Sequence, residues 1–412
     1  MQSGVFPSSG VGQDSTAPPE ENGYALVLSG GGVRATAFHL GLLLRLAAEG
    51  RLEHVKAIST VSGGSLAAGL VFSRAGLEWP SSRNFIDSVL PQASSALVKL
   101  SLQGRAVSRT LTRPWKLVTS RGNLLAEALE DAWGIAGNPK ELSHCPQWFV
   151  NATCYETGRN WRFSQKHLGD WKFGHNFKQV VPIAVAVAAS AAIPYMAGFV
   201  QLKTQNEGWF SIDPATDQPV RPIAPMLASV RLWDGGVYEN LGMEPIYKPY
   251  RGLVNKSIQF IIIGDASANL LDHLGPAGMF TLKYPFIRPP RLFDITTEQT
   301  RALRSRMLIE AMLEGRLRGA IVRLGRSVDY VDGQSRRMRP RSGKDSFLGE
   351  DAVLRAATYP TNASRMTVTD FHLLLRHGFE SADATITGFL PSEFQNSMSW
   401  QDIKTYCRNL PN

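Results

Sequence analysis

The sequence has few cysteines, and their arrangement excludes two classes of protein. Only Cys145, Cys154 and Cys407 occur among 412 residues, and none lies in a CxxC pair or a cysteine/histidine cluster with metal-ligand spacing. A disulfide-linked scaffold and a cysteine-based metal site are therefore not expected, and the sequence implies no metal or organic cofactor. With 43% hydrophobic residues the chain can bury a sizeable core of its own.

A secretory signal is also missing from the start of the sequence. Residues 1–22 are rich in Ser, Gly and Pro and lack a basic start followed by an apolar core. We expect a disordered tail there and a cytoplasmic protein. One uncharged run, residues 181–200, has the length of a membrane span. Pro182 and Pro194 interrupt it, and Ala and Val dominate it, so a buried helix and turn is favoured over a span.

Acidic residues are absent between Asp87 and Glu127, and basic residues exceed acidic ones in the chain by 44 to 35. This excess favours adsorption to an anionic partner. Within residues 99–121 the basic side chains are Lys99, Arg105, Arg109, Arg113, Lys116 and Arg121. We expect this segment to contact an anionic membrane peripherally, although Pro114 must end or kink a helix there and a solvated basic face is the alternative. Nucleic-acid binding is not expected, because no module signature interleaves these arginines with aromatics.

Short apolar runs alternate with helical patterns along the chain, which predicts an α/β fold. The predicted strands are residues 24–29, 56–61, 148–155, 160–163, 229–233 and 257–264, and the predicted helices are residues 35–49, 64–74, 183–192, 297–317 and 368–377. A Glu156-Thr157-Gly158 turn between two of the strands predicts an antiparallel hairpin at the sheet edge. The run SIQFIIIG at residues 257–264 is apolar enough for a parallel strand buried on both faces.

These elements suggest how the chain is organised. We expect a core domain at residues 23–270 that carries a basic helical insertion at about residues 76–145. Residues 271–412 should form a C-terminal helical extension that packs on this domain.

The strongest chemical feature is the sequence Thr60-Val61-Ser62-Gly63-Gly64, where a predicted strand turns into a helix. A serine exposed on such a sharp turn, beside a helix amino end and small neighbours, is placed to act as a nucleophile. A serine N-cap followed by flexible glycines is the competing interpretation.

Two further motifs follow predicted strands. Gly30, Gly31 and Gly32 precede the first helix, where backbone N–H groups can approach an anion closely, as a phosphate or an oxyanion requires. Asp234 begins the sequence Asp234-Gly235-Gly236 at the end of another strand, although an aspartate in an ordinary turn would look the same. The glycine loop and Ser62 should meet at the carboxyl ends of adjacent strands, where open parallel sheets bind ligands.

Together these motifs resemble the patatin-like phospholipase family, with the glycine loop, the nucleophile elbow and the Asp-Gly-Gly motif in the family's order. Residues 189–194 (ASAAIP) are similar to a further family block. The resemblance implies a three-layer α/β/α sandwich with a central, mainly parallel sheet. It also implies hydrolysis of acyl esters of phospholipids or other lipids, with Ser62 as nucleophile, Asp234 as its base and Gly30, Gly31 and Gly32 as oxyanion hole. Arg34 matches an arginine that is thought to meet the lipid phosphate in related cytosolic phospholipases.

Two positions depart from the family's pattern. Thr60 replaces the first glycine of the usual Gly-x-Ser-x-Gly elbow, and its branched side chain could crowd the turn. Ala35 ends the glycine loop where many members have glycine. Both substitutions keep the residues small, so we expect a subfamily with the same activity.

Two other functions remain open. An ordinary α/β-hydrolase would need a histidine after the acid, for which His273, His372 and His377 are the candidates. A nonenzymatic phosphate- or nucleotide-binding module would use the glycine loop, but it would leave Ser62 and Asp234 without a role. A serine-reactive probe separates the enzyme from the binding module.

Overall fold

The computed structural model describes residues 23–105, 108, 121–194, 197–213, 216, 218–267, 291–335 and 347–411. The expected N-terminal tail and most of the basic segment at residues 99–121 lie outside the described residues, so both stay predictions. Within the described part, no helix is long and apolar enough to cross a membrane. The uncharged run at residues 181–200 contributes the short buried helix α8 (Ile183–Ser190) instead of a span.

The centre of the molecule is a parallel sheet in the order β14-β13-β1-β2-β3. These strands are β14 (Gly319–Arg323), β13 (Ile258–Asp265), β1 (Gly23–Leu28), β2 (Val55–Val61) and β3 (Gln147–Cys154). Their predicted positions are confirmed within a residue or two, except for β14, which the sequence analysis did not anticipate. The C-terminal part of the chain therefore adds a strand to the sheet as well as helices.

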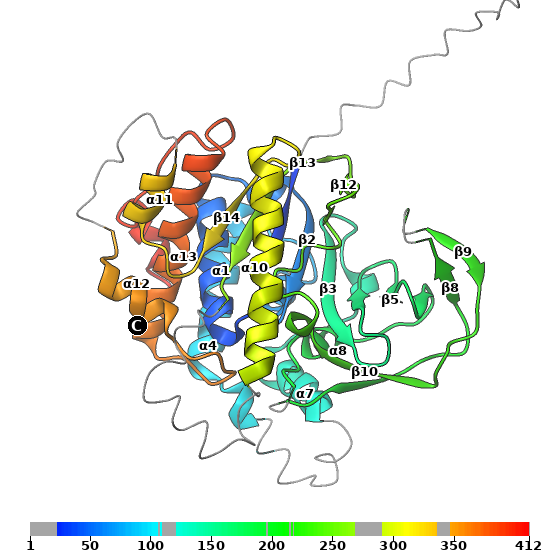
Figure 1. The fold of residues 1–412 in the computed structure, drawn as a ribbon. Helices are drawn as coiled ribbons and strands as arrows, with labels where there is room; N and C mark the ends of the chain where they lie inside the picture. The colour runs from blue at the N-terminus through cyan, green and yellow to red at the C-terminus, as the bar shows by residue number, and fades with distance from the viewer. Residues whose placement is uncertain are drawn as a thin grey trace, which may run out of the picture.

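An antiparallel extension continues the sheet beyond β3 (Figure 1). The expected hairpin is present, because β3 pairs antiparallel with β4. Beyond it lie further short strands that the sequence analysis did not separate. The strands of the extension are β4 (Asn160–Phe163), β5 (Leu168–Asp170), β6 (Gly174–Asn176), β8 (Trp209–Ile212) and β9 (Pro219–Pro222), and a branch consists of β10 (Ser229–Asp234) and β7 (Val200–Lys203). A separate small pair joins β11 (Tyr247–Lys248) to β12 (Gly252–Leu253).

Helices cover both faces of the parallel sheet and make three layers (Figure 1). Along β1, Leu26 enters one core cluster while Ala25 and Val27 enter the other, as alternating side chains of a strand must. The first cluster includes residues of α1 (Gly32–Ala48), α2 (Gly63–Arg74), α4 (Leu90–Lys99), α7 (Arg121–Trp133) and α13 (Val368–Phe389). The second is closed by α10 (Arg291–Leu313). This arrangement is the expected α/β/α sandwich with a mainly parallel central sheet.

The C-terminal helix α13 packs closely against α1. A Cβ added to Gly41 of α1 would lie 2.0 Å from the Leu375 carbonyl oxygen, and one added to Gly378 would lie 2.1 Å from that of Phe38. A buried ion pair of 2.6 Å between Arg45 and Asp383 joins the same two helices. The shorter helices α11 (Val328–Gln334) and α12 (Glu350–Ala357) lie beside α13 (Figure 1).

Candidate active site

Ser62 occupies a strained turn between β2 and α2. Its φ of 49° and ψ of −113° lie in a region that residues with a side chain rarely adopt, and such strain is typical of functional sites. The turn depends on the glycines that follow. A Cβ on Gly63 would lie 2.4 Å from the Gly32 carbonyl oxygen, and a Cβ on Gly64 would lie 2.1 Å from that of Leu28. Only glycines therefore let this turn approach the end of β1 and the glycine loop.

A buried polar network supports the turn from behind. The Ser62 N–H donates to the Ser190 hydroxyl (2.9 Å), and Ser190 donates to the Asn151 carbonyl (2.6 Å). Ser65 lies within 2.8 Å of both the Ser190 and the Thr60 hydroxyl oxygens. The indole N–H of Trp148 donates to Thr60 at 3.0 Å. Thr60 thus does not crowd the elbow, because its hydroxyl belongs to this network.

The sequence analysis did not assign a role to Ser190. The sequence does indicate such a role, because Ser190 places a single hydroxyl at the end of the otherwise apolar helix α8, where an unpaired polar group would be costly. The helix delivers that hydroxyl to the backbone N–H of Ser62, so Ser190 positions Ser62.

The glycine loop lies directly beside Ser62. A Cβ on Gly30 would lie 3.1 Å from the Ser62 Cβ, and the Gly30 N–H donates to the Asn240 carbonyl (3.2 Å). Gly31 and Gly32 have φ values of 142° and 60°, which favour glycine. Among the described residues, neither donates its N–H to another group. The structure therefore brings the loop and Ser62 together, with two uncommitted donors at the amino end of α1.

Asp234 ends β10, which pairs with β3 so that Asp234 lies opposite Ala152. Its carboxyl accepts a hydrogen bond from the Gly236 N–H (2.7 Å), and the Ser62 side chain lies near enough to interact with it. Burial raises the pKa of this carboxyl from 3.8 to about 6, and the interactions with Gly236 and Ser62 oppose the shift. The direction of the shift is the one that desolvation beside an apolar strand produces.

Asn240 connects the glycine loop to the Asp-Gly-Gly turn. A Cβ added to Gly30 would lie 2.3 Å from its side-chain oxygen, and one added to Gly236 would lie 2.7 Å from it. Its amide N–H donates to the Ser267 hydroxyl at 2.8 Å. The preceding Glu239 is buried and accepts three backbone N–H groups, from Leu241, Gly242 and Met243. Burial raises its pKa. Both residues hold the loops in place, a role that the sequence analysis did not assign to them.

Arg34 is buried, with 1% of its surface exposed. Its guanidinium donates to the carbonyl oxygens of Ala357 (3.2 Å), Tyr359 (2.9 Å) and Ala266 (3.2 Å). These contacts join the start of α1 to the end of β13 and to the segment after α12. The role of Arg34 toward a lipid phosphate stays a prediction. The three contacts favour a role in which Arg34 positions the segments that follow β13 and α12.

The histidine candidates of a catalytic triad make other contacts. His377 lies in α13, accepts the Gly325 N–H (2.9 Å), and burial lowers its pKa to about 4. His372 lies 2.8 Å from the Pro411 carbonyl oxygen. His273 falls outside the described residues. In the described chain, no histidine hydrogen-bonds to Ser62 or Asp234, and no cluster of three metal-ligating side chains occurs.

The family model for patatin-like phospholipases matches residues 26–247, which include Ser62, Asp234 and the glycine loop. The chain belongs to the patatin-like phospholipase family. The resemblance drawn from the motifs is thereby confirmed, and the family is one of lipid acyl hydrolases. A search of curated proteins gave no match.

A solved structure shares the fold of this patatin-like chain, and others resemble it more weakly. Human GIVD cytosolic phospholipase A2 is similar with a TM-score of 0.52 and 14% identity, over 95% of this chain and 63% of that one. The same human protein in complex with methyl gamma-linolenyl fluorophosphonate gives 0.46 and 16%, over 96% and 61% of the two chains. VipD from Legionella pneumophila gives 0.32 and 11%, over 88% and 66%. This chain thus spans less than two thirds of the human protein, and at these identities the likeness concerns the fold alone.

Proposed function

We propose that this protein hydrolyses fatty acyl esters of phospholipids or lysophospholipids through an acyl-enzyme on Ser62, with Asp234 as the base. One observation carries the proposal: the Ser62 side chain interacts with the buried Asp234 carboxyl, whose pKa is raised to about 6. At neutral pH that carboxyl is ionised, yet it is a stronger base than an ordinary aspartate. The strained backbone of Ser62 supports the same role.

The proposed reaction has two steps. Asp234 takes the Ser62 proton as the hydroxyl oxygen attacks the ester carbonyl, and the N–H groups of Gly31 and Gly32 receive the developing oxyanion. Asp234 then returns the proton to the leaving alcohol. In the second step Asp234 takes a proton from water, which attacks the acyl-enzyme and releases the fatty acid. The proton then passes back to the Ser62 oxygen.

The two competing functions have less support. A Ser-Asp-His esterase requires a histidine beside Ser62, but His372 and His377 are hydrogen-bonded elsewhere. A nonenzymatic phosphate-binding module would give no reason for a strained serine beside a buried carboxyl. Mass spectrometry of a mixed lipid panel tests the proposal: the native protein should release fatty acid and lysophospholipid, and the Ser62→Ala protein should not.

The activity should depend on pH through Asp234. Only the ionised carboxyl can accept the Ser62 proton, so kcat/KM on a soluble ester should fall about tenfold per pH unit below about pH 6 and level off above it. An ordinary aspartate would place this limb near pH 4. The profile is measured together with the thermal unfolding midpoint at each pH, so that acid unfolding is recognised. A limb near pH 4 in folded protein would contradict the raised pKa.

Arg34→Ala should damage the fold more than it changes substrate choice. Three carbonyl oxygens lose a charged donor, so the free energy of unfolding should fall by at least about 2 kcal/mol. Activity on a phospholipid and on a small neutral ester should fall by the same factor. Arg34→Lys keeps the charge but not the fork of donors, so most of the loss should remain. A loss confined to the phospholipid, with stability unchanged, would instead support contact with the lipid phosphate.

We also propose peripheral contact with anionic membrane through residues 99–121, as their charge suggests.

A further inference from the structure

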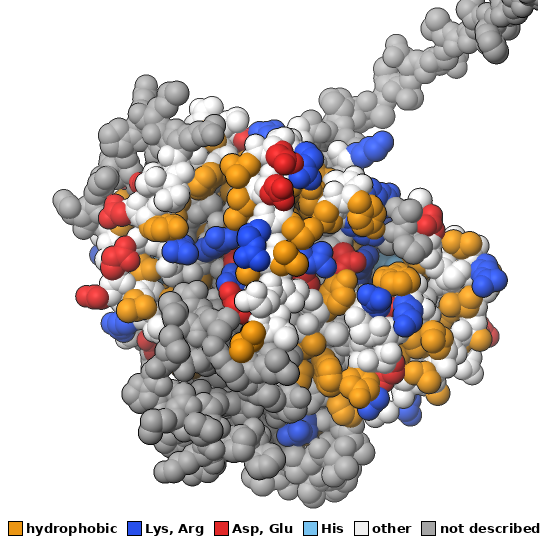
Figure 2. Space-filling view, in the orientation of Figure 1, with side chains coloured by type: hydrophobic (Ala, Val, Ile, Leu, Met, Phe, Trp, Pro, Cys, Tyr) orange, Lys and Arg blue, Asp and Glu red, His pale blue; other side chains and the backbone are white. Residues whose placement is uncertain are grey.

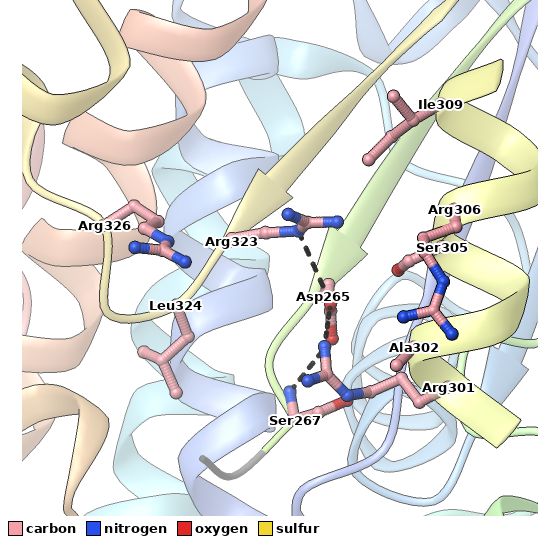
Figure 3. Close-up of a pocket in the computed structure, with 10 residues that line it drawn as sticks. All are labelled: Asp265, Ser267, Arg301, Ala302, Ser305, Arg306, Ile309, Arg323, Leu324 and Arg326. Carbon is pink, nitrogen blue, oxygen red and sulfur yellow. Dashed lines mark hydrogen bonds and ion pairs between the residues drawn. The ribbon is translucent and has the colours of Figure 1, made fainter. Parts of the chain in front are cut away.

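A pocket separate from Ser62 lies at the carboxyl ends of β13 and β14, beside α10 (Figure 3). This pocket has a volume of about 230 Å³. Its charged lining residues are Asp265, Arg301, Arg306, Arg323 and Arg326. Basic side chains also gather over β14 and α10 on this face of the molecule (Figure 2).

The positive charge of the pocket exceeds its negative charge. Asp265 pairs with Arg301 at 2.8 Å and with Arg323 at 3.8 Å, and Arg301 also pairs with Glu298. Arg306 and Arg326 are exposed and have no acidic partner among the described residues. Arg326 lies over the Tyr330 ring at 4.4 Å. Within the described part of the chain, two positive charges on opposite sides of the pocket are therefore uncompensated (Figure 3).

Two buried donors in the same pocket also have no hydrogen-bond partner among the described residues. Ser305 is 5% exposed, lines the pocket from α10, and its hydroxyl makes no hydrogen bond there. The Arg323 Nε is buried and makes none either, because the 3.8 Å to its ion-pair partner Asp265 exceeds hydrogen-bond distance. Native proteins rarely leave such groups without a partner. A ligand that accepts hydrogen bonds would satisfy both.

The size and lining of the pocket select the ligand. A volume of about 230 Å³ is below the roughly 300 Å³ at which pockets for larger organic ligands begin. The charged lining disfavours an acyl chain. Several arginines and a serine hydroxyl instead suit a phosphate group, because one guanidinium can donate two parallel hydrogen bonds to two phosphate oxygens.

The pocket adjoins the Ser62 site along the same edge of the sheet. Ser267 lines it and accepts a hydrogen bond from Asn240 (2.8 Å), whose carbonyl accepts the Gly30 N–H. The Ala266 carbonyl, next in the chain, accepts a hydrogen bond from Arg34. Two residues, Ser267 and Asn240, therefore connect the pocket to Gly30 of the glycine loop.

We propose that this pocket binds a phosphate group, held by Arg306, Arg323 and Arg326 together with the Ser305 hydroxyl. The phosphate can belong to a lipid headgroup or be free in solution. The proposal concerns binding, and it does not depend on hydrolysis at Ser62.

Binding is measured with the full-length Ser62→Ala protein, so that lipid is not consumed. Isothermal titration calorimetry with inorganic phosphate gives one arm, and cosedimentation with vesicles of phosphatidylcholine with and without phosphatidic acid gives the other. Arg306→Gln with Arg326→Gln should weaken binding at least about tenfold. Arg355→Gln with Arg408→Gln removes the same charge from exposed positions outside the pocket and should change binding less than about twofold.

Ser305→Ala provides a variant with a separate readout. Its hydroxyl has no partner in the unliganded protein, so the substitution should weaken binding while leaving the unfolding midpoint unchanged. Pocket-dependent binding of inorganic phosphate would assign a soluble phosphate ligand. Pocket-dependent binding of phosphatidic acid vesicles alone would assign a lipid headgroup. Equal weakening by the two double substitutions, or no pocket-dependent binding of either probe, would overturn the proposal.

Discussion

Ser62→Ala should lower esterase activity by at least about 10³-fold and abolish labelling by a fluorophosphonate. The substitution removes the hydroxyl that lies near the Asp234 carboxyl at the strained turn between β2 and α2. The acyl-enzyme cannot form without that oxygen. Activity is measured on a soluble ester and on phospholipid vesicles, and labelling is measured on a gel.

Ser73→Ala is the matched control, because it removes a serine hydroxyl from α2, the helix that follows Ser62, at a position without a hydrogen-bond partner among the described residues. It should retain activity and labelling. Undiminished labelling of the folded Ser62→Ala protein would move the active site elsewhere.

Asp234→Asn should be nearly as inactive as Ser62→Ala, because a neutral amide cannot accept the Ser62 proton. The fold should survive, since the amide oxygen can still accept the Gly236 N–H. The folded-state pKa of Asp234 is raised from 3.8 to about 6, so the stability that this shift provides is complete below about pH 4 and is lost as pH rises through about 6. At neutral pH the ionised carboxyl therefore destabilises the protein, and the Asn variant should unfold at an equal or higher temperature.

The histidine variants separate this dyad from a triad. His273→Ala, His372→Ala and His377→Ala should each keep activity within about tenfold, or roughly 1.4 kcal/mol of barrier. Burial of His377 makes a folding check necessary, because its ring accepts the Gly325 N–H. If one histidine variant is folded and as inactive as Asp234→Asn, a Ser-Asp-His hydrolase replaces the proposed mechanism.

Local sequence patterns were sufficient to locate the parallel core and the loops of the candidate site. The strands β1 and β2 are short apolar runs that end in glycine-rich turns, and each is followed by a helical repeat. Because adjacent parallel strands bring their carboxyl ends together, the glycine loop and Ser62 could be predicted to meet. Asp234 was singled out as a charged residue at the end of a mostly apolar strand, although that strand, β10, pairs antiparallel with β3.

Contacts between distant parts of the chain could not be predicted in this way. Arg34 follows the glycine loop in sequence, but its partners Ala357 and Tyr359 lie more than 300 residues away. Ser190 reaches Ser62 only because α8 packs beside the elbow. The strand β14 is five residues long and lies in a region with helical patterns, and only its pairing with β13 reveals it. No local periodicity records such pairings.

Peptide mapping of the fluorophosphonate adduct by mass spectrometry tests the central claim most directly. The native protein should carry a single adduct on the peptide that contains Ser62, and the Asp234→Asn protein should acquire it far more slowly. An adduct on another serine, or equal labelling rates in the two proteins, would contradict the assignment of Ser62 and Asp234 as nucleophile and base.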